Sequence, residues 1–312
     1  MQDQTCLVVG GHGFIGQHLV RRLCGLGAKV VVLSPKSEAP IVGCDYKFYK
    51  SDIEQIDSLA NLKDTSFNYV YNLAGYIDHS PFFKNGSSVI NDHFIGLLNL
   101  LQNLDRSNLK SFVQVGSSDE YGGLDAPQVE TMREAPISPY SLAKTSATQL
   151  IQMLSKTEQL PGVVLRFFLV YGPGQNDKRF LPQIIQGCLA NKSFPTSTGA
   201  QLRDFCYIDD VIDAILMAST NEQCHGEVLN IASGAPMAIK EMIQTIVGLV
   251  GAGDPQFGQF PDRIGENKAL YANIQKAKTL LGWTPRVSLE EGLSRTISYY
   301  RDALKVNKEK IS

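Results

Sequence analysis

The feature that most constrains the fold is a glycine-rich turn placed between a strand and a helix. A short apolar run, Thr5–Val9, leads directly into Gly10-Gly-His-Gly-Phe-Ile-Gly16, and an amphipathic pattern over about Gln17–Leu26 predicts a helix. Such spacing permits a tight turn, lets the backbone approach a pyrophosphate and allows close packing of helix on strand. His12, inside the turn, is expected to face solvent or phosphate. The residues predicted to contact a dinucleotide here are Gly10, Gly13, Phe14, Ile15 and Gly16.

Further apolar runs alternate with helical patterns along the first half of the chain. Strands are predicted at 29–33, 46–49, 69–75, 110–115 and 162–168, and helices at 88–103 and 140–155. This alternation predicts an α/β fold with a Rossmann-type, doubly wound parallel sheet.

The alternation breaks down after Gly174, where the chain becomes rich in loops. We therefore expect residues 1–174 and 204–230 to form the dinucleotide-binding domain. Residues 175–203 and 231–312 are expected to form a smaller, discontinuous C-terminal substrate domain that closes over the cofactor edge.

The end of the second predicted strand bears on the choice of dinucleotide. A carboxylate usually follows this strand and bonds the adenine ribose, but here the sequence is Ser34-Pro35-Lys36. A serine and a lysine could accept a 2′-phosphate, so NADP(H) is favoured over NAD(H). The alternative is that Lys36 points into water. Further expected cofactor contacts are Asp52, Ile53, Leu73, Ala74, Gly75 and Phe167.

A tyrosine and a lysine four residues apart mark the opening of the helix predicted at 140–155. At this spacing Tyr140 and Lys144 share one helical face, where the lysine can lower the pKa of the phenol and bond the ribose of a dinucleotide. The same pattern alone usually means a solvated helix face. Context favours the functional reading, because Gly116–Gly122 brings hydroxyls and carboxylates to the carboxyl edge of the predicted sheet.

Composition limits the classes of partner and compartment. The formal net charge of -2 argues against nucleic acid or a membrane surface as the main partner. Six cysteines lie far apart without a C-x-x-C pair, so neither a zinc site nor a disulfide framework is indicated. No apolar run is long enough to span a bilayer, and the N-terminus has no signal-peptide pattern, so a cytoplasmic protein is expected.

Over nearly its whole length the chain resembles the extended short-chain dehydrogenase/reductase family, in its nucleotide-sugar epimerase/dehydratase branch. The motifs that carry the resemblance occur in the family's order: Gly10-x-x-Gly13-x-x-Gly16, Asp52-Ile53, Leu73-Ala74-Gly75, Ser117-Ser118, Tyr140-x-x-x-Lys144, Tyr171-Gly172-Pro173, Arg203-Asp204-Phe205-x-Tyr207-Ile208-Asp209-Asp210 and Leu281-Gly282-Trp283-x-Pro285.

The resemblance implies roles for individual residues. Tyr140 would be the catalytic acid/base, Lys144 would hold the ribose and lower the tyrosine pKa, and Ser117 would bond the reacting oxygen. Arg203 and Arg263 would bind the substrate's diphosphate, with a surface salt bridge as the plain alternative. The further substrate contacts expected are Tyr76, His79, Ser118 and Leu181.

Two departures from the family pattern and one acidic position bear on the reaction. Leu169 replaces a common asparagine, so one polar substrate contact is missing, and His93 also stands where asparagine is common. A lone helical histidine is more often a satisfied core group than a catalyst. Asp119 lies where dehydratase members carry an acid, so it could act on C5 or C6 chemistry or simply shape the sugar pocket.

The resulting hypothesis is an NAD(P)-dependent enzyme that exchanges hydride with C4 of an NDP-hexose. It could be a 4-epimerase, a 4,6-dehydratase or a 4-ketoreductase. Asp119 favours dehydratase chemistry, whereas Ser34 and Lys36 favour an NADPH-consuming reductase. The rival of another class is a non-catalytic dinucleotide-binding sensor or scaffold. Excess apolar surface on the helices predicted at 88–103 and 140–155 further predicts a homodimer through a four-helix bundle, as is common in the family.

Overall fold

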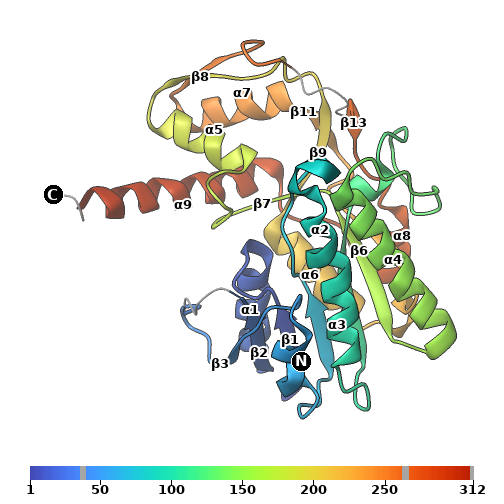
Figure 1. The fold of residues 1–312 in the computed structure, drawn as a ribbon. Coiled ribbons are helices and arrows are strands. Elements are labelled where there is room, and N and C mark those ends of the chain that lie inside the picture. The colour runs from blue at the N-terminus through green and yellow to red at the C-terminus, as the bar shows by residue number, and fades with distance from the viewer. Residues whose placement is uncertain (36–39, 262–266, 310–312) are drawn as a thin grey trace.

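The structure is a computed structural model of the single chain and describes residues 1–35, 40–261 and 267–309 (Figure 1). Two residues with predicted roles, Lys36 and Arg263, lie outside these ranges. None of the described helices combines the length and apolar composition that crossing a bilayer would require.

A seven-stranded parallel sheet forms the centre of the molecule, with strand order β10-β6-β5-β4-β1-β2-β3. Its strands are β1 Thr5–Val9, β2 Lys29–Ser34, β3 Tyr46–Lys50, β4 Tyr69–Asn72, β5 Ser111–Ser117, β6 Gly162–Phe167 and β10 Val228–Ile231. The order reverses between β1 and β4, which is the point where open α/β sheets bind ligands. The Rossmann-type fold predicted from the alternating pattern is confirmed.

Helices cover both faces of this sheet because successive strand residues point to opposite sides. In β1, Cys6 and Val8 join the apolar core under α1 Phe14–Gly25 and α6 Ile208–Ser219. Leu7 and Val9 face the other core, which includes residues of α3 Gly96–Gln102 and α4 Pro139–Glu158. The remaining short helical turns are η1 Ile56–Leu62, η2 Phe82–Gly86, η4 Ser118–Tyr121 and η5 Glu222–Cys224.

The helix predicted at 88–103 is present but is not a uniform α-helix. It begins as α2 Ser88–Ile90, widens into a π-turn, η3 Asn91–Ile95, and continues as α3. The π-turn holds His93, which is buried. Such wide turns often occur at functional sites.

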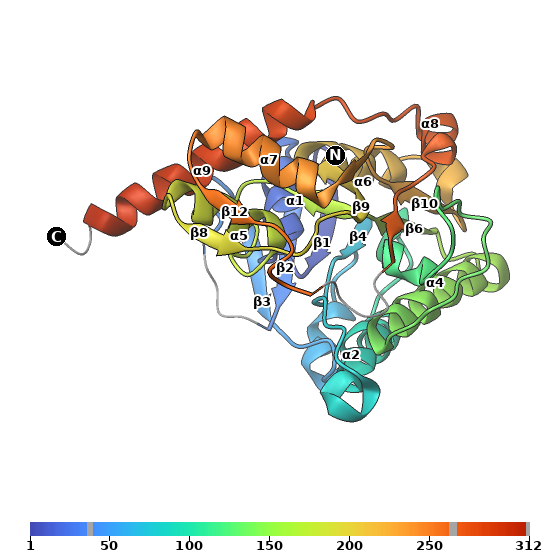
Figure 2. The ribbon, with the colours of Figure 1, turned by 90° about the horizontal axis from the view of Figure 1, so that it is seen from above.

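A smaller region lies beyond the carboxyl edge of the large sheet (Figures 1 and 2). In it, β9 Leu202–Tyr207 pairs with β7 Leu169–Tyr171, β11 Pro236–Ala238 and β13 Ala269–Leu270. A separate pair joins β8 Ser193–Pro195 to β12 Asp254–Gln256. The other helices are α5 Phe180–Leu189, α7 Ile239–Val250, α8 Gln275–Leu281 and α9 Leu289–Glu309. The predicted division into two domains stays a prediction, although β9 belongs to the smaller sheet.

The smaller sheet is organised around one buried carboxylate. Asp204 of β9 accepts hydrogen bonds from the Ser233 backbone at 2.7 Å, the Ser233 hydroxyl at 2.6 Å, and the backbone N–H groups of Gly234 at 3.0 Å and Ala272 at 3.3 Å. It therefore ties together segments that are far apart in the sequence.

Candidate active site

The glycine turn has the shape expected of a phosphate cradle. Gly10 adopts a φ of +78°, and its carbonyl accepts the Gly13 N–H at 2.8 Å. A Cβ at Gly16 would lie 2.3 Å from the Gly10 oxygen, so only glycine allows this approach. Gly13 caps α1 without a side chain, which leaves the N–H groups of the first turn, from Phe14 and Ile15 onward, to an anion. The arrangement fits the pyrophosphate of a dinucleotide.

Other predicted cofactor residues gather around this turn. A Cβ at Gly10 would lie 3.0 Å from the Leu73 oxygen and 3.1 Å from the Ala74 nitrogen, so the end of β4 runs beside the turn. Ser34 ends β2 opposite Lys50 of β3. Asp52 follows β3, and its carboxylate accepts the Glu54 N–H at 3.0 Å. The other two predicted contacts, Ile53 and Phe167, are both largely buried.

His12 does not face solvent as expected. Its ring stacks on Phe48 with 4.9 Å between ring centres, and its Nε2 lies 3.2 Å from the Tyr46 hydroxyl. The expectation of a solvent-facing ring is wrong because β3 pairs with β2 and carries these aromatic side chains over the turn, whereas the alternative of a contact with phosphate stays a prediction.

The helix that carries the tyrosine and the lysine begins with a tightly defined cap. The Ser138 hydroxyl accepts the Ser141 N–H at 3.1 Å, and the Ser141 hydroxyl accepts the Ser138 N–H at 2.9 Å. Proline at 139 suits the first helical position. Tyr140 and Lys144, one turn apart, are each only 4% exposed. The sequence therefore fixes the tyrosine at the first turn of α4.

Lys144 is held by the neighbouring strand and does not reach the phenol in the chain alone. Its Nζ donates to the Val115 carbonyl at 2.9 Å and lies 5.9 Å from the centre of the Tyr140 ring. Burial lowers the pKa of Lys144 to about 8, although the charges of Glu120 and Asp119 oppose this. The pKa of about 8 means that Lys144 changes between its ammonium and neutral amine forms near this pH.

The pKa of Tyr140 is raised, contrary to the expectation that Lys144 would lower it. Burial of the phenolate is the main cause, the Asp119 carboxylate adds to it, and a hydrogen bond with Ser117 opposes it. In the chain alone burial is the main cause, and the lowering of the phenol pKa by Lys144 stays a prediction for the complex with the dinucleotide. Tyr140 therefore carries its proton at neutral pH.

Ser117 ends β5 and caps η4. Its hydroxyl accepts the Asp119 N–H at 3.2 Å, and its own N–H donates to the Glu120 carboxylate at 2.8 Å. Ser118, the next residue, is buried. The structure therefore brings Ser117, Tyr140 and Lys144 together at one edge of the sheet, as predicted from the sequence.

The buried ion pair behind Ser117 was missed by the sequence analysis. Glu120 and Arg166 are both fully buried, and the Arg166 Nε donates to Glu120 at 2.9 Å. The same guanidinium pairs with Glu134. An arginine inside the apolar strand 162–168 was the available signal, because a buried guanidinium requires an anion.

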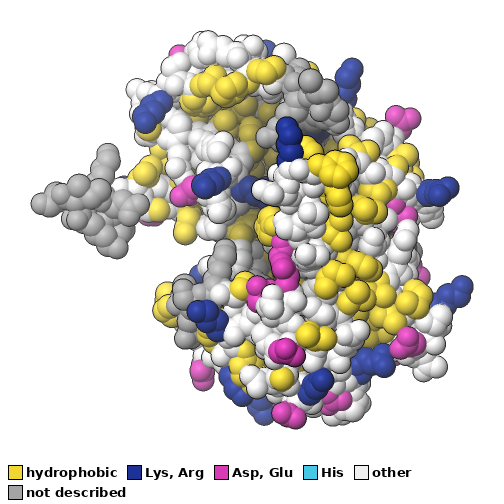
Figure 3. Space-filling model, viewed as in Figure 1, with side chains coloured by type: hydrophobic (Ala, Val, Ile, Leu, Met, Phe, Trp, Pro, Cys, Tyr) yellow, Lys and Arg dark blue, Asp and Glu magenta, His cyan; other side chains and the backbone are white. Residues whose placement is uncertain are grey.

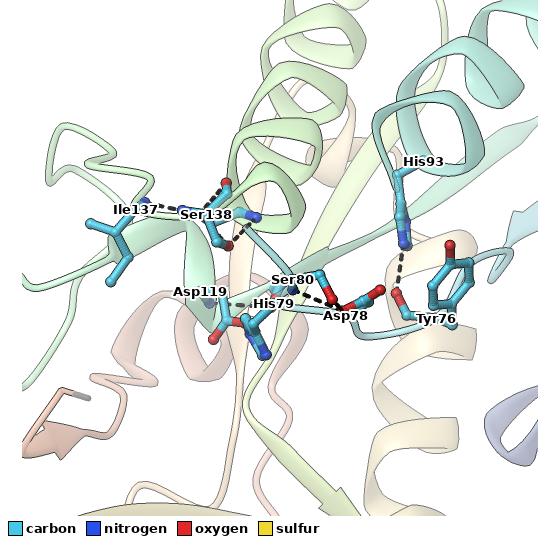
Figure 4. Close-up of polar contacts among 10 residues, drawn as sticks. Tyr76, Asp78, His79, Ser80, His93, Asp119, Ile137 and Ser138 are labelled. Atoms are coloured by element: carbon cyan, nitrogen blue, oxygen red, sulfur yellow. Dashed lines mark hydrogen bonds and ion pairs between the residues drawn. The ribbon is translucent and has the colours of Figure 1, made fainter. Parts of the chain in front are cut away.

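Asp119 is paired with His79 (Figure 4). The His79 Nε2 lies 2.7 Å from the Asp119 carboxylate, and the His79 ring stands edge-on to the Tyr140 ring at 5.6 Å between centres. Both side chains of the pair are partly exposed. His79 and Asp119, predicted separately, thus form one unit beside the tyrosine.

His93 also contacts the tyrosine ring, at 5.1 Å between ring centres. Its Nε2 is 2.8 Å from the Tyr76 carbonyl (Figure 4). Burial and the charge of Lys144 lower the pKa of His93 to about 3, so the imidazole is neutral. A Cβ at Gly75 would lie 2.0 Å from this ring, so glycine is needed there. These contacts agree with the reading of His93 as a satisfied core group.

The remaining predicted substrate residues occupy different environments. Arg203 is 7% exposed and donates to the Leu202 carbonyl at 2.8 Å, so its side chain does not lie on the open surface. Leu181 of α5 is buried in the larger apolar core, whereas the side chain of Tyr76 is exposed. Their contacts with a substrate stay a prediction.

Comparison with known proteins identifies the relatives of this fold and site. Residues 6–232 match the NAD dependent epimerase/dehydratase family. A UDP-glucuronate 4-epimerase of Thermodesulfobacterium geofontis is 28% identical over 319 residues, which cover 97% of this chain and 98% of that protein. A dTDP-glucose 4,6-dehydratase of Streptomyces niveus is 27% identical, with 95% and 92% covered. The crystal structure of a UDP-glucose 4-epimerase of Thermotoga maritima, 29% identical, matches with a TM-score of 0.89 over 96% of this chain and 99% of that chain.

Proposed function

Since the chain belongs to the NAD dependent epimerase/dehydratase family, we propose that it inverts the configuration at C4 of an NDP-hexose. It is an NAD(P)-dependent enzyme that modifies sugar nucleotides by hydride transfer. The observation that carries the proposal is the buried Tyr140 with Ser117 and Lys144 beside it. Full-length relatives named as UDP-sugar 4-epimerases support this net reaction.

The residues of the site divide the work of the reaction. Ser117 and Tyr140 would bond the substrate O4. The phenolate form of Tyr140, which the ammonium of Lys144 would stabilise in the complex with the dinucleotide, would take the O4 proton as the C4–H bond breaks and return it afterwards. The ammonium of Lys144 would hold the ribose of the dinucleotide, and the first turn of α1 its pyrophosphate. When bound, a nicotinamide would supply the acceptor and donor of the hydride at C4. Arg203 would bind the diphosphate of the sugar nucleotide.

A second candidate is an NADPH-consuming 4-ketoreductase, which the end of β2 favours. No carboxylate occurs in Ser34-Pro35-Lys36 to repel a 2′-phosphate. We therefore keep NADP(H) as the proposed dinucleotide, although a UDP-glucuronic acid 4-epimerase of Bacillus cereus, 28% identical, was solved with NAD. Titration of the protein with NAD(H) and NADP(H) tests this preference.

One experiment separates the possible reactions. The protein is incubated with UDP-, GDP-, dTDP- and CDP-hexoses and their 4-keto forms, while nicotinamide absorbance and product masses are recorded. An isomer of unchanged mass with no net change in absorbance indicates a 4-epimerase, whereas loss of water indicates a 4,6-dehydratase. Stoichiometric oxidation of NADPH indicates a ketoreductase. Absence of turnover across the panel overturns the proposed function.

Assembly as a homodimer through α2, α3 and α4 is also proposed. Apolar side chains gather over this face of the molecule (Figure 3). Ile95, Leu142 and Met153 are 38%, 47% and 46% exposed. Two such faces could form a four-helix bundle that removes these side chains from water.

Light scattering tests the dimer. Leu142→Glu with Met153→Glu should give a mass near that of one chain, whereas the parent should give twice that mass. Leu26→Glu, at an exposed apolar position outside this face, is the matched control. A parent that stays monomeric on concentration rules the dimer out.

A cytoplasmic location is the last proposal. All six cysteines are unpaired in the structure, which suits a reducing compartment.

A further inference from the structure

Behind the catalytic serine lies a fully buried carboxylate to which the proposed chemistry gives no role. Glu120 accepts the Ser117 N–H at 2.8 Å, the Thr148 hydroxyl at 2.8 Å and the Arg166 Nε at 2.9 Å. We propose that Glu120 is a positioning residue that fixes Ser117 and supplies the buried negative charge facing Tyr140 and Lys144. This inference rests on the proposed roles of those three residues.

Glu120 contacts both the turn that holds Ser117 and the helix that holds Tyr140, and the proposed reaction depends on the relative position of these two residues. Ser117 caps η4, and Glu120 reaches back from the third position of that turn to the Ser117 N–H, so the capping box fixes the serine backbone. The other carboxylate oxygen accepts the hydroxyl of Thr148, which lies two turns after Tyr140 on the same helix. Glu120 therefore sets the position of the serine relative to the tyrosine.

The carboxylate packs closely against the backbone of Gly116. A Cβ at Gly116 would lie 2.6 Å from the Glu120 Oε1 and 3.0 Å from the Arg166 Cγ. Gly116 is also the register partner of Arg166 across β5 and β6. The pairing of these two strands thus brings the guanidinium to the carboxylate.

The charge of Glu120 matters as well as its shape. A buried ion pair is weak evidence for stability, since apolar residues of similar volume often do as well. Its negative charge raises the pKa values of both Lys144 and Tyr140, and so favours the protonated form of each. The titratable and charged groups that face Glu120 or its partner are Arg166, Glu134, Asp119, Tyr121, Tyr140 and Lys144.

The test compares Glu120→Gln with Glu134→Gln in the full-length protein. Both changes remove one carboxylate from Arg166, but only the first touches Ser117. Glu120→Gln should lower kcat by about 100-fold with KM within about threefold. Its pH profile of kcat/KM should move to lower pH, because Lys144 and Tyr140 both lose their protons more easily. Glu134→Gln should stay within about threefold of the parent with an unmoved profile.

A second variant and a second measurement guard against misfolding. Glu120→Gln with Arg166→Met removes both members of the fully buried pair and leaves only Glu134, whose side chain is 18% exposed, without its partner. This variant should keep the lowered kcat and the shifted profile. NMR titration of protein labelled with ¹³C at the lysine ε-carbon, with Lys144 assigned through Lys144→Arg, should show a lower pKa in Glu120→Gln.

The outcomes separate this inference from the proposed function. An active parent together with a Glu120→Gln variant of equal kcat and equal pH profile overturns the positioning role. A parent inactive on every sugar nucleotide overturns the proposed function instead. In that case the NMR titration still decides, and an unchanged pKa of Lys144 in Glu120→Gln overturns the inference.

Discussion

Two regions of the molecule are each built around a fully buried carboxylate: the edge of the large sheet that holds the proposed catalytic residues, and the smaller sheet. The two carboxylates have different kinds of partner. Glu120 is paired with the guanidinium of Arg166, whereas the contacts of Asp204 are N–H and hydroxyl donors from Ser233, Gly234 and Ala272. Burial raises the pKa of both carboxyl groups.

The difference indicates what each carboxylate does. The N–H and hydroxyl groups around Asp204 satisfy the hydrogen-bonding needs of its oxygens. Through these bonds Asp204 joins three segments of the chain. An ion pair beside Tyr140 and Lys144 also contributes to the electrostatic potential at these two side chains. Changes at the catalytic edge should therefore reduce turnover and spare folding, and changes around Asp204 should do the reverse.

The largest effect is expected for Tyr140→Phe. Turnover should fall by about 10³-fold because the proton relay is lost, while dinucleotide binding and the melting temperature stay close to those of the parent. Lys144→Ala, by contrast, should weaken both turnover and binding. Steady-state kinetics, dinucleotide titration and thermal unfolding measure these. Turnover of Tyr140→Phe within a few-fold of the parent would show that the relay is assigned wrongly.

Asp204→Asn should produce the opposite pattern. An amide offers one acceptor oxygen and turns N–H donors toward the backbone N–H groups, so the free energy of unfolding should fall by roughly 3 kcal/mol. The kcat of the folded fraction should stay near the parental value. Denaturant unfolding and active-site titration check the two parts. A large loss of kcat in fully folded Asp204→Asn protein would contradict the view that Asp204 serves stability and not turnover.

The pH dependence of dinucleotide binding tests whether the charge of Lys144 contributes to that binding. Its pKa is lowered to about 8, so the side chain is an ammonium below this pH and neutral above it. Affinity should therefore fall, by about tenfold, as the pH rises through this value. Lys144→Arg should bind without this step, because a guanidinium stays charged. Dinucleotide titrations between pH 6 and 10 would show this fall in affinity. A parental affinity that does not change over this pH range contradicts the prediction.

The smallest effect is expected at the end of β2, away from both carboxylates. Ser34→Asp combined with Lys36→Ala should shift preference toward NAD(H) by several-fold, because a carboxylate repels a 2′-phosphate and bonds a free 2′-hydroxyl. The parent should bind NADP(H) more tightly. Parallel titrations with both dinucleotides measure the ratio, and a parental preference for NAD(H) refutes the idea.

Features that depend on neighbouring residues could be predicted from the sequence. The glycine turn at 10–16 and the alternation of strands and helices are local patterns, and they predicted the large sheet and the place of Gly116–Gly122 at its carboxyl edge. The proximity of Ser117 to Tyr140 was implied by the family resemblance. The pairing of Glu120 with Arg166 could not be found this way, because 46 positions separate the two residues and only the register of β5 with β6 joins them.

Two other features depended on tertiary packing. The burial of His12 follows from the aromatic side chains of β3, whose place beside β2 no local pattern reveals. The raised pKa of Tyr140 follows from desolvation, which exists only once the helix has packed. The spacing of tyrosine and lysine predicted their proximity but not the balance of charge and burial.

The π-turn at Asn91–Ile95 makes the length of this segment as important as its composition. A wide turn holds one residue more than an α-helical path needs, so a deletion of one residue there would restore a regular helix. Everything on one side would then rotate by about 100° relative to the other. His93 would leave the Tyr140 ring, or Leu97 and Leu100 would leave the sheet. Length variants at this site should thus be far less tolerated than substitutions on its exposed side.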